Sequence, residues 1–418
     1  MRILQICSGD FFSTYGGGQV YVKNLVDELI NQGEDVAVAS FVATPPRKCE
    51  YRARTIYEIN GDEDLRQAII EARPDVIHAH SHKGVVCAIG AELHIPVVVT
   101  SHHGGIVCPA GALLTCDDRI CDTPVCHKSC LPCVLRVIRT GSFWYHAMRH
   151  LPQNSYIALG RFLRRLPFIP FITPIGCAAL SMRAKHEDWQ RIIGGCTTMV
   201  APCQRIADAL TLNGFPPQRI KVIPHGIPLP KSVPPFPPVI GGAVKFFYVG
   251  RISYEKGLHT LIQAFLKLQQ PNAELHIIGG SSNKGERQYE NRLKKLSHAD
   301  SRITWHGKLP PEQIFDAIAG YHVSSSSSFL EAFGLNIAES LAMGKPILAT
   351  RNGGAEQQIT DGVNGWLVES ENVREMADKM AEICRTLTTF DTMKATAAVH
   401  SMAEHTQQLL QVYHATQD

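Results

Sequence analysis

The sequence predicts an α/β protein built from two Rossmann-like, doubly wound domains that face a central cleft. Short buried strands alternate with helices through most of the chain. This alternating series starts twice, at Met1 and again at Lys245, and a proline-rich stretch separates the two halves. The length of 418 residues suits two domains of ordinary size. In such sheets ligands bind at the carboxyl ends of the strands.

In the first half, Val20 to Gln32 shows helical periodicity, because Val22, Leu25 and Leu29 fall on one face. Further helices are expected at 65–72, 84–93 and 204–213, and strands at 1–7, 35–41, 75–79, 96–100, 198–202 and 221–224. In the second half, strands are expected at 245–249, 274–278, 302–305, 323–326 and 346–350, and helices at 257–269, 286–297, 311–319 and 334–343. We therefore predict an N-terminal domain 1–230, a linker 231–242, a C-terminal domain 243–400, and a last helix, 401–418, that packs back on the N-terminal domain.

Composition narrows the class of protein. Hydrophobic residues make up 44% and charged residues 19%, and the net charge of +3 with a pI near 8.2 is too mild to indicate nucleic-acid binding. The apolar run at Met1 is too short for a signal peptide, and no stretch reaches about 18 uninterrupted apolar residues. We expect a cytoplasmic protein whose 13 cysteines are mostly reduced.

Two segments of the second half have the chemistry of a diphosphate site. Arg251 and Lys256 follow a strand and a glycine turn, where a leaving diphosphate needs cationic donors. Gly334 opens a helix whose free backbone N–H groups can bind phosphate. Glu331 precedes that helix and can reach sugar hydroxyls, while Glu339, more than one turn inside it, can accept hydrogen bonds from a ribose.

Each segment also has a simpler interpretation. The two cations suit a solvated surface turn, and the helix dipole alone favours a carboxylate near a helix N-terminus. A third segment, Thr350 to Glu356, contains Gly353 and Gly354, which let the backbone approach a ligand closely or form an ordinary turn. The order and spacing of the three segments together favour the diphosphate site.

Taken together, the motifs resemble those of retaining glycosyltransferases of family 4, which have the two-domain GT-B fold. The resemblance spans nearly the whole chain and rests on Gly16-Gly17-Gly18, Asp75-Val-Ile-His-Ala-His80, Val99-Thr-Ser-His102, Pro224-His-Gly-Ile227, Val249-Gly-Arg251 with Lys256-Gly257, Glu331-x7-Glu339 and Asp361-Gly-Val-Asn-Gly365.

The resemblance implies roles for the donor-side residues of the C-terminal domain. Arg251 and Lys256 would hold the diphosphate, Glu331 would contact the donor sugar, and Glu339 would bind the ribose hydroxyls. The backbone at 333–335 (Phe333, Gly334 and Leu335) would support phosphate or sugar.

It also implies roles in the N-terminal, acceptor-side domain. Gly17 and Gly18 would close over the diphosphate, and His102 would join Glu331 and the two cations at the reaction centre. His103 follows His102 directly, so either imidazole could face the cleft, and either could be a hydrogen-bonded structural residue.

By the same resemblance, the activity is transfer of a hexose or N-acetylhexosamine from a UDP- or GDP-sugar to a hydroxyl acceptor, with retention and without a catalytic metal. The acceptor would be a lipid-linked glycan or a surface polysaccharide or lipopolysaccharide. The sequence lacks an Asp-x-Asp motif, which agrees with Arg and Lys taking the place of a metal. Two alternatives stay open: a nucleotide-sugar epimerase of the same fold, and a non-catalytic, zinc-stapled protein that binds sugar nucleotides.

Six cysteines and a histidine crowd into one segment between positions 108 and 133, and Cys130-x2-Cys133 has the spacing of a metal knuckle. A subset of family 4 resembles this chain in carrying such an insertion. That resemblance favours a structural zinc on Cys108, Cys121, Cys130 and Cys133, with Cys116, Cys126 and His127 as substitutes. An iron–sulfur cluster, free thiols or disulfides are the alternatives.

The segment 160–172 joins Arg161, Arg164 and Arg165 to bulky apolar residues. Such a surface suits peripheral docking on the anionic inner membrane, where lipid-linked acceptors occur. The alternative is an internal helix and strand of the N-terminal domain, and three prolines argue against one long amphipathic helix.

Overall fold

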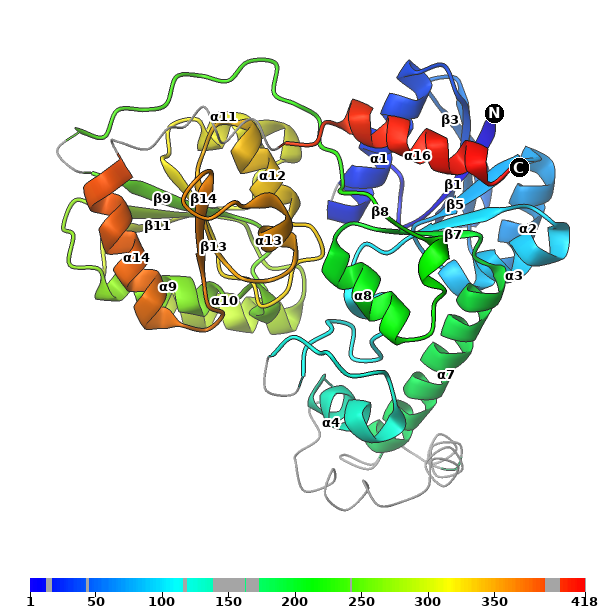
Figure 1. The fold of residues 1–418 in the computed structure, drawn as a ribbon, viewed down its shortest axis with the longest axis horizontal. Coiled ribbons are helices and arrows are strands. Elements are labelled where there is room, and N and C mark those ends of the chain that lie inside the picture. Colours follow the sequence, from blue (N-terminus) through cyan, green and yellow to red (C-terminus); the bar gives the residue numbers. More distant parts are fainter. Residues whose placement is uncertain are drawn as a thin grey trace. The chain divides into compact units, whose positions relative to one another are not determined.

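The computed structural model describes residues 1–12, 17–42, 45–115, 119–137, 162, 173–240, 243–387 and 399–417. The chain divides into two compact units. The first consists of Met1–Pro224 together with Thr406–Asp418, and the second of His225–His405. Figure 1 shows that each unit is a sheet flanked by helices. The N-terminal segment of the first unit ends at Pro224, whereas the sequence predicted a boundary at 230.

An eight-stranded sheet forms the first unit, in the order β3-β4-β2-β1-β5-β6-β7-β8. All neighbours are parallel except β3 and β4. The strands are β1 Arg2–Ser8, β2 Asp35–Phe41, β3 Arg47–Tyr51, β4 Arg54–Ile59, β5 Val76–Ala79, β6 Val97–Thr100, β7 Thr198–Ala201 and β8 Ile220–Val222. The helices are α1 Gly17–Asn31, α2 Asp62–Ala72, α3 Lys83–Leu93, η1 Gly104–Ile106, α4 His127–Val137, α7 Thr173–Gly195, α8 Gln204–Leu212, η2 Pro217–Arg219 and the end of α16 Met402–Ala415.

The sequence prediction missed the β3–β4 hairpin at the edge of this sheet. Strand β3 has no fully buried residue, so it lacks the apolar alternation that reveals a half-buried strand. Its turn is made by Arg52 and Ala53, both with positive φ (49° and 60°), instead of the Asn-Gly or Asp-Gly pair that marks such turns. The predicted glycine loop was also partly wrong, because α1 already begins at Gly17.

The second unit is a six-stranded, fully parallel sheet in the order β11-β10-β9-β12-β13-β14. Its strands are β9 Lys245–Val249, β10 Glu274–Ile278, β11 Ile303–Gly307, β12 Val323–Ser326, β13 Ile347–Thr350 and β14 Gly365–Val368. Its helices are η4 Tyr254–Lys256, α9 Leu258–Lys267, α10 Lys284–Ser297, η5 Pro311–Gln313, α11 Ile314–Ile318, α12 Leu335–Ala342, α13 Gly354–Gln358 and α14 Val373–Thr386.

Strand β9 shows how the second sheet is covered on both faces. Phe246 and Tyr248 lie in one apolar cluster with residues of α9 and α14, and Phe247 lies in another with Ile318 of α11. Successive side chains of a strand point to opposite faces, so a continuous apolar run is what a strand buried on both faces requires. Figure 1 shows α9 and α14 lying side by side.

In each sheet the strand order reverses beside its first strand, between β1 and β5 in the first unit and between β9 and β12 in the second. In open α/β sheets ligands bind outside the carboxyl ends of the strands at such a reversal. Arg251 follows β9 and Glu331 follows β12, so the predicted donor residues of the second unit lie at its reversal. Among the described residues, no helix is long and apolar enough to cross a membrane.

Two glycines of the second unit allow a matched test of backbone packing. Gly257 (φ +60°) lies so close to the backbone of Ser327 that a Cβ would come within 2.0 Å of its carbonyl oxygen. Gly362 (φ +75°) has the same left-handed conformation and no neighbour within 4 Å of an added Cβ.

We expect Gly362→Ala to lower the free energy of unfolding by about 1–2 kcal/mol, the cost of the left-handed conformation alone. Gly257→Ala should add an overpacking cost of about 1–3 kcal/mol. Urea unfolding of the two variants measures the difference, and equal losses would contradict the close contact.

Candidate active site

The loop after β9 presents Arg251 at the carboxyl end of the strand. The phenol of Tyr248 donates a hydrogen bond to the Arg251 carbonyl at 2.7 Å, which fixes the backbone there. The guanidinium, about half exposed, pairs with Glu255 at 2.6 Å and with Glu286 at 3.2 Å. A single cation thus faces two carboxylates, and an incoming anion could compete with them for its N–H donors.

Lys256 and Glu331 meet although 75 residues separate them in the sequence. The Lys256 ammonium donates to Glu331 Oε1 at 2.5 Å, and the hydroxyl of Ser328 donates to the same oxygen at 2.7 Å. Glu331 is only 8% exposed, so its charge depends on these two donors. The structure therefore brings together two of the residues that the sequence predicted for the reaction centre.

Backbone hydrogen bonds join the loops after β9, β12 and β13 into one platform. The amide of Phe329 donates to the carbonyl of Glu255 at 3.0 Å, which ties the β12 loop to the β9 loop. Glu331 donates to the Asn352 carbonyl at 3.1 Å and accepts from the amide of Gly354 at 2.8 Å, which ties it to the β13 loop. Glu331 is therefore held by both its backbone and its carboxylate.

Gly354 has a different role from the ligand approach that the sequence suggested. A Cβ at this position would lie 2.5 Å from the carbonyl oxygen of Phe333 and 2.9 Å from that of Glu331. The glycine is thus required for contact with the β12 loop, and its amide is already bonded to Glu331. Gly354 therefore lets the loop after β13 pack closely against the loop after β12.

Helix α12 begins next to Glu331 with a left-handed Gly334 at its N-cap (φ 85°). No side chain caps this helix, so its first amides are left for an anion or solvent. Phe333 is buried and Leu335 is half-buried beside this terminus. The predicted phosphate-binding backbone at 333–335 therefore lies where the helix N-terminus would attract a negative charge.

Glu339 lies in α12, and its side chain is partly buried without a compensating group. The described residues give its carboxylate neither a hydrogen-bond donor nor an ion-pair partner. Burial raises the pKa of Glu339 from 4.5 to about 7. A carboxylate that is shielded from solvent and lacks hydrogen-bond donors is suited to accept hydrogen bonds from a diol such as ribose.

Sequence reasoning missed two buried amides that support this platform. Gln358 donates to the carbonyl of Phe333 and, at 3.2 Å, to that of Gly354. Asn352 donates to the Ser328 carbonyl at 3.2 Å and accepts from the amide of Ala355 at 2.9 Å. Asn352 directly precedes Gly353-Gly354 and Gln358 follows the pair in the sequence. Polar residues near that glycine pair were therefore the sequence signal that could have identified them.

In the first unit, the structure separates the roles of His102 and His103. The ring of His103 accepts a hydrogen bond from the amide of Gly105 at 2.9 Å and so caps η1. Burial, reinforced by Lys83 and Lys185, lowers the pKa of His103 to about 4, so this ring is neutral. His102 instead bonds to His80, with 2.9 Å between Nε2 and Nδ1. Gly17 and Gly18 form the exposed first turn of α1.

The predicted zinc ligands are not assembled by the described residues. Within that part of the chain, no three Cys, His, Asp or Glu side chains are placed to hold a metal ion. Cys108 is buried, whereas Cys121, Cys130 and Cys133 are half-buried. Cys116 lies outside the described residues. Zinc stays a prediction, and no chemistry below depends on it.

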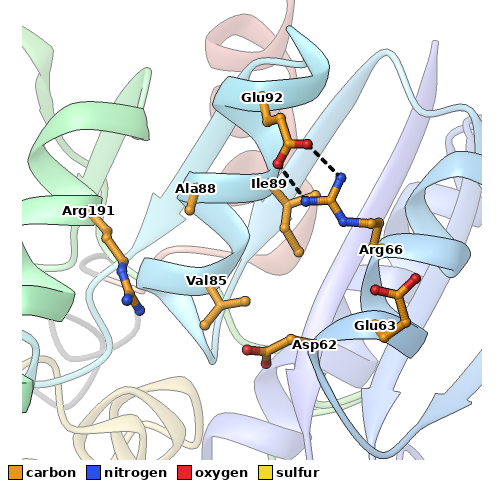
Figure 2. A pocket seen from close by; sticks show the side chains of 8 residues that line it. All are labelled: Asp62, Glu63, Arg66, Val85, Ala88, Ile89, Glu92 and Arg191. Carbon is orange, nitrogen blue, oxygen red and sulfur yellow. Dashed lines mark hydrogen bonds and ion pairs between the residues drawn. The ribbon is translucent and has the colours of Figure 1, made fainter.

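A cavity of about 370 Å³ lies between α2, α3 and α7 of the first unit, and none of the predicted site residues lines it. Figure 2 shows its lining, in which Arg66 pairs with both carboxylate oxygens of Glu92 at 2.9 and 2.5 Å. An arginine already bound in this way has few donors left for a ligand. The cavity therefore does not compete with the second unit's platform as the candidate site.

Comparison with known proteins indicates the class of protein to which this chain is similar. Residues 15–114 match the family model described as Glycosyltransferase Family 4, and residues 237–390 match that of Glycosyl transferases group 1. A D-inositol 3-phosphate glycosyltransferase from Arthrobacter sp. (strain FB24) is 28% identical over 254 residues, 56% of this chain and 60% of that protein. One from Mycolicibacterium smegmatis is 33% identical over 141 residues, 32% of this chain and 31% of that protein.

Solved structures give the fold. Anabaena HepE in complex with UDP and glucose matches with a TM-score of 0.65 at 17% identity, over 99% of each chain. The lipopolysaccharide outer core galactosyltransferase WaaB matches with a TM-score of 0.64 at 13% identity, over 100% of each chain. Sucrose-phosphate synthase from Thermosynechococcus elongatus has a TM-score of 0.68 at 16% identity, over 100% of this chain and 99% of that one.

Two Rossmann-like units, together with the solved structures that match nearly the whole chain, define the GT-B fold, as the sequence predicted. The chain belongs to glycosyltransferase family 4. It spans between 49% and 60% of the length of three curated relatives that it matches.

The raised pKa of Glu339 gives a pH-dependent test. Between pH 4.5 and about 7 the folded carboxyl keeps its proton while the unfolded one loses it, so the folded state binds more protons and its stability falls as pH rises. Glu339→Gln removes this loss. We expect the variant to be more stable than the parent at pH 8 by about 1–3 kcal/mol, and the two to converge near pH 4.5.

Urea unfolding at pH 4.5, 6 and 8 measures this difference. Glu312→Gln, a change at an exposed glutamate of the same unit, is the matched control and should show no such trend. A Glu339→Gln variant that tracks the parent at every pH would contradict the desolvated carboxyl.

Proposed function

We propose that this chain is a retaining glycosyltransferase that moves a hexose or N-acetylhexosamine from a UDP-sugar to a hydroxyl acceptor. The observation that carries the proposal is the Lys256–Glu331 pair at the β9/β12 reversal, beside the uncapped N-terminus of α12. Cation, helix terminus and carboxylate are the groups that a sugar diphosphate needs, and they are gathered from segments far apart in the sequence.

The diphosphate would take over the cations that carboxylates now hold. Arg251 pairs with Glu255 and Glu286, and Lys256 with Glu331. Phosphate oxygens carry more charge than a carboxylate and accept from several donors at once, so they can displace such contacts. As the bond to the sugar breaks, charge grows on the leaving diphosphate, and fixed cations stabilise that charge.

The two glutamates would then act on opposite parts of the donor. Glu331, released from Lys256, keeps its backbone position and can accept hydrogen bonds from sugar hydroxyls. Glu339 lacks a donor among the described residues, and ribose hydroxyls would supply one. Attack on the same face as the departing diphosphate, assisted by that phosphate, would retain the configuration, with neither glutamate acting as a general base.

Likeness to named proteins supports the choice of donor and acceptor class. HepE is solved with UDP and glucose, which favours UDP over GDP. The relatives named D-inositol 3-phosphate glycosyltransferase and the galactosyltransferase WaaB support a polyol or glycan hydroxyl as acceptor. A lipid-linked acceptor and docking of the segment 160–172 on a membrane belong to the same proposal, although that segment lies outside the described residues except for Phe162.

Replacing Lys256 tests the diphosphate role. Lys256→Met keeps the length of the side chain but removes its charge, and leaves Glu331 buried without its cation. We expect kcat/KM for transfer to fall by about 100-fold or more, the size found when one charge-stabilising donor is lost. Lys267→Met, at an exposed lysine of α9, is the control and should keep full activity.

The measurement starts with a thermal-shift screen of UDP, GDP, ADP and their sugars, because a ligand that binds only the folded state raises its stability. Product analysis with the best donor then decides the reaction. A new sugar epimer formed without acceptor would indicate an epimerase instead, and binding without turnover would indicate a non-catalytic protein.

A further inference from the structure

A chain of buried hydrogen bonds runs through the first unit behind His102. His102 Nε2 lies 2.9 Å from His80 Nδ1, and His80 Nε2 lies 2.7 Å from Gln5 Oε1. The amide of Gln5 lies 3.4 Å from the hydroxyl of Tyr413, which lies 2.6 Å from His78 Nδ1. We propose that this relay fixes the tautomer of His102, with Gln5, His80 and Tyr413 as its positioning residues.

The lengths of the hydrogen bonds set the direction of the relay. The 2.6 Å link between Tyr413 and His78 is shorter than the usual N–H···O range but normal for an O–H donor, so the phenol donates to His78. Because the phenol of Tyr413 donates its only hydrogen to His78, it must accept from the amide NH₂ of Gln5. The carbonyl oxygen of the same Gln5 side chain accepts from His80 Nε2.

His80 is thereby left with a lone pair on Nδ1, which can only accept. His102 must donate from Nε2, so when its ring is neutral the lone pair lies on Nδ1. At the other end, His78 Nε2 donates to the hydroxyl of Thr100 at 2.7 Å, so every link runs the same way. The direction is thus set by the bond from Tyr413 to His78, and it reaches His102 from Tyr413 through three hydrogen bonds, by way of Gln5 and His80.

Burial makes this arrangement hard to reverse. Gln5, His78, Thr100 and Tyr413 are fully buried, and His80 is 7% exposed. Hydrogen bonds in such surroundings are strong, and reversing one link would leave two donors or two acceptors facing each other elsewhere in the relay. Two further contacts hold the rings in place: Tyr21 packs edge-on against His102 at 5.0 Å, and Lys83 donates to the His80 carbonyl at 2.7 Å.

The consequence for recognition rests on the proposed function. A His102 ring with a lone pair on Nδ1 is an acceptor there, so it would bind a sugar hydroxyl that donates its hydrogen. A deoxy sugar lacking that hydroxyl would lose the contact. The tautomer itself follows from the relay alone and does not depend on which substrate the enzyme uses.

The test is 15N NMR of the full chain with labelled histidine, because the two ring nitrogens of a neutral imidazole differ in shift according to which carries the proton. His102→Gln identifies the His102 signals by their loss. The expected result is a His102 ring protonated on Nε2. A ring protonated on Nδ1, or an equal mixture of the two, would overturn the proposal.

Variants along the relay test its direction and reach. His80→Phe and Gln5→Met each remove a link, and both should shift His102 toward a mixture of tautomers, whereas His80→Gln, which can still accept and donate, should preserve the parent form. Tyr413→Phe should act in the same direction as Gln5→Met but more weakly. His94→Gln, at an exposed histidine of the same unit, is the control. An unchanged His102 in both His80→Phe and Gln5→Met would overturn the proposal.

Kinetics separates this inference from the proposed function. His80→Phe should lower kcat/KM by about 10- to 100-fold, the size found when the hydrogen-bond partner that orients a metal-ligating histidine is removed, while its Kd for UDP stays unchanged. If His80→Phe does not fold, Gln5→Met and Tyr413→Phe carry the same comparison. If the unmodified protein does not bind UDP, the proposed function is refuted, but the result on the His102 tautomer still stands.

Discussion

The ion pair between Lys256 and Glu331 is the interaction on which the second unit's site depends. It joins the loop after β9 to the loop after β12, the two strands that flank the reversal of the sheet. A buried pair of this kind is a weak source of stability, because removing two charges from water offsets most of their attraction. Its value lies in position, since the two groups are held ready for a ligand that carries both negative charge and hydroxyls.

Around this pair, backbone hydrogen bonds hold the loops rigidly, whereas the charged side chains are held by ion pairs that a ligand can replace. Glu331 is fixed by amide and carbonyl bonds to the β13 loop, and the absence of a Cβ at Gly257 and Gly354 lets the three loops touch. Of the two carboxylates that hold Arg251, that of Glu255 is 40% exposed and that of Glu286 only 10% exposed. A ligand can therefore replace ion pairs without disturbing the platform, which is the preorganisation that charge stabilisation needs.

Much of the fold and half of the site could be predicted from local sequence patterns. Strand and helix alternation placed β9, β10 and β12 with the observed bounds. Strand β9 is a nearly continuous apolar run, as a strand buried on both faces requires, whereas β12 is Val323 followed by three buried serines. Gly334, Glu331 and Glu339 stood out because glycine at a helix start and carboxylates at fixed offsets are local features. Long-range contacts left no such trace: Gln5 meets Tyr413 across 408 residues, and the hairpin of β3 and β4 turns on Arg52 and Ala53 without a glycine.

Tyr413 also bears on the order in which the chain can fold. It is fully buried in the first unit, yet the whole of the second unit, His225–His405, is translated before it. Domains usually fold as they leave the ribosome, starting from the N-terminus. Here the first unit has an incomplete interior, its polar side chains Gln5 and His78 lacking the phenol that joins them, until the second unit has been synthesised. The first unit is therefore completed only after the whole of the second has been made.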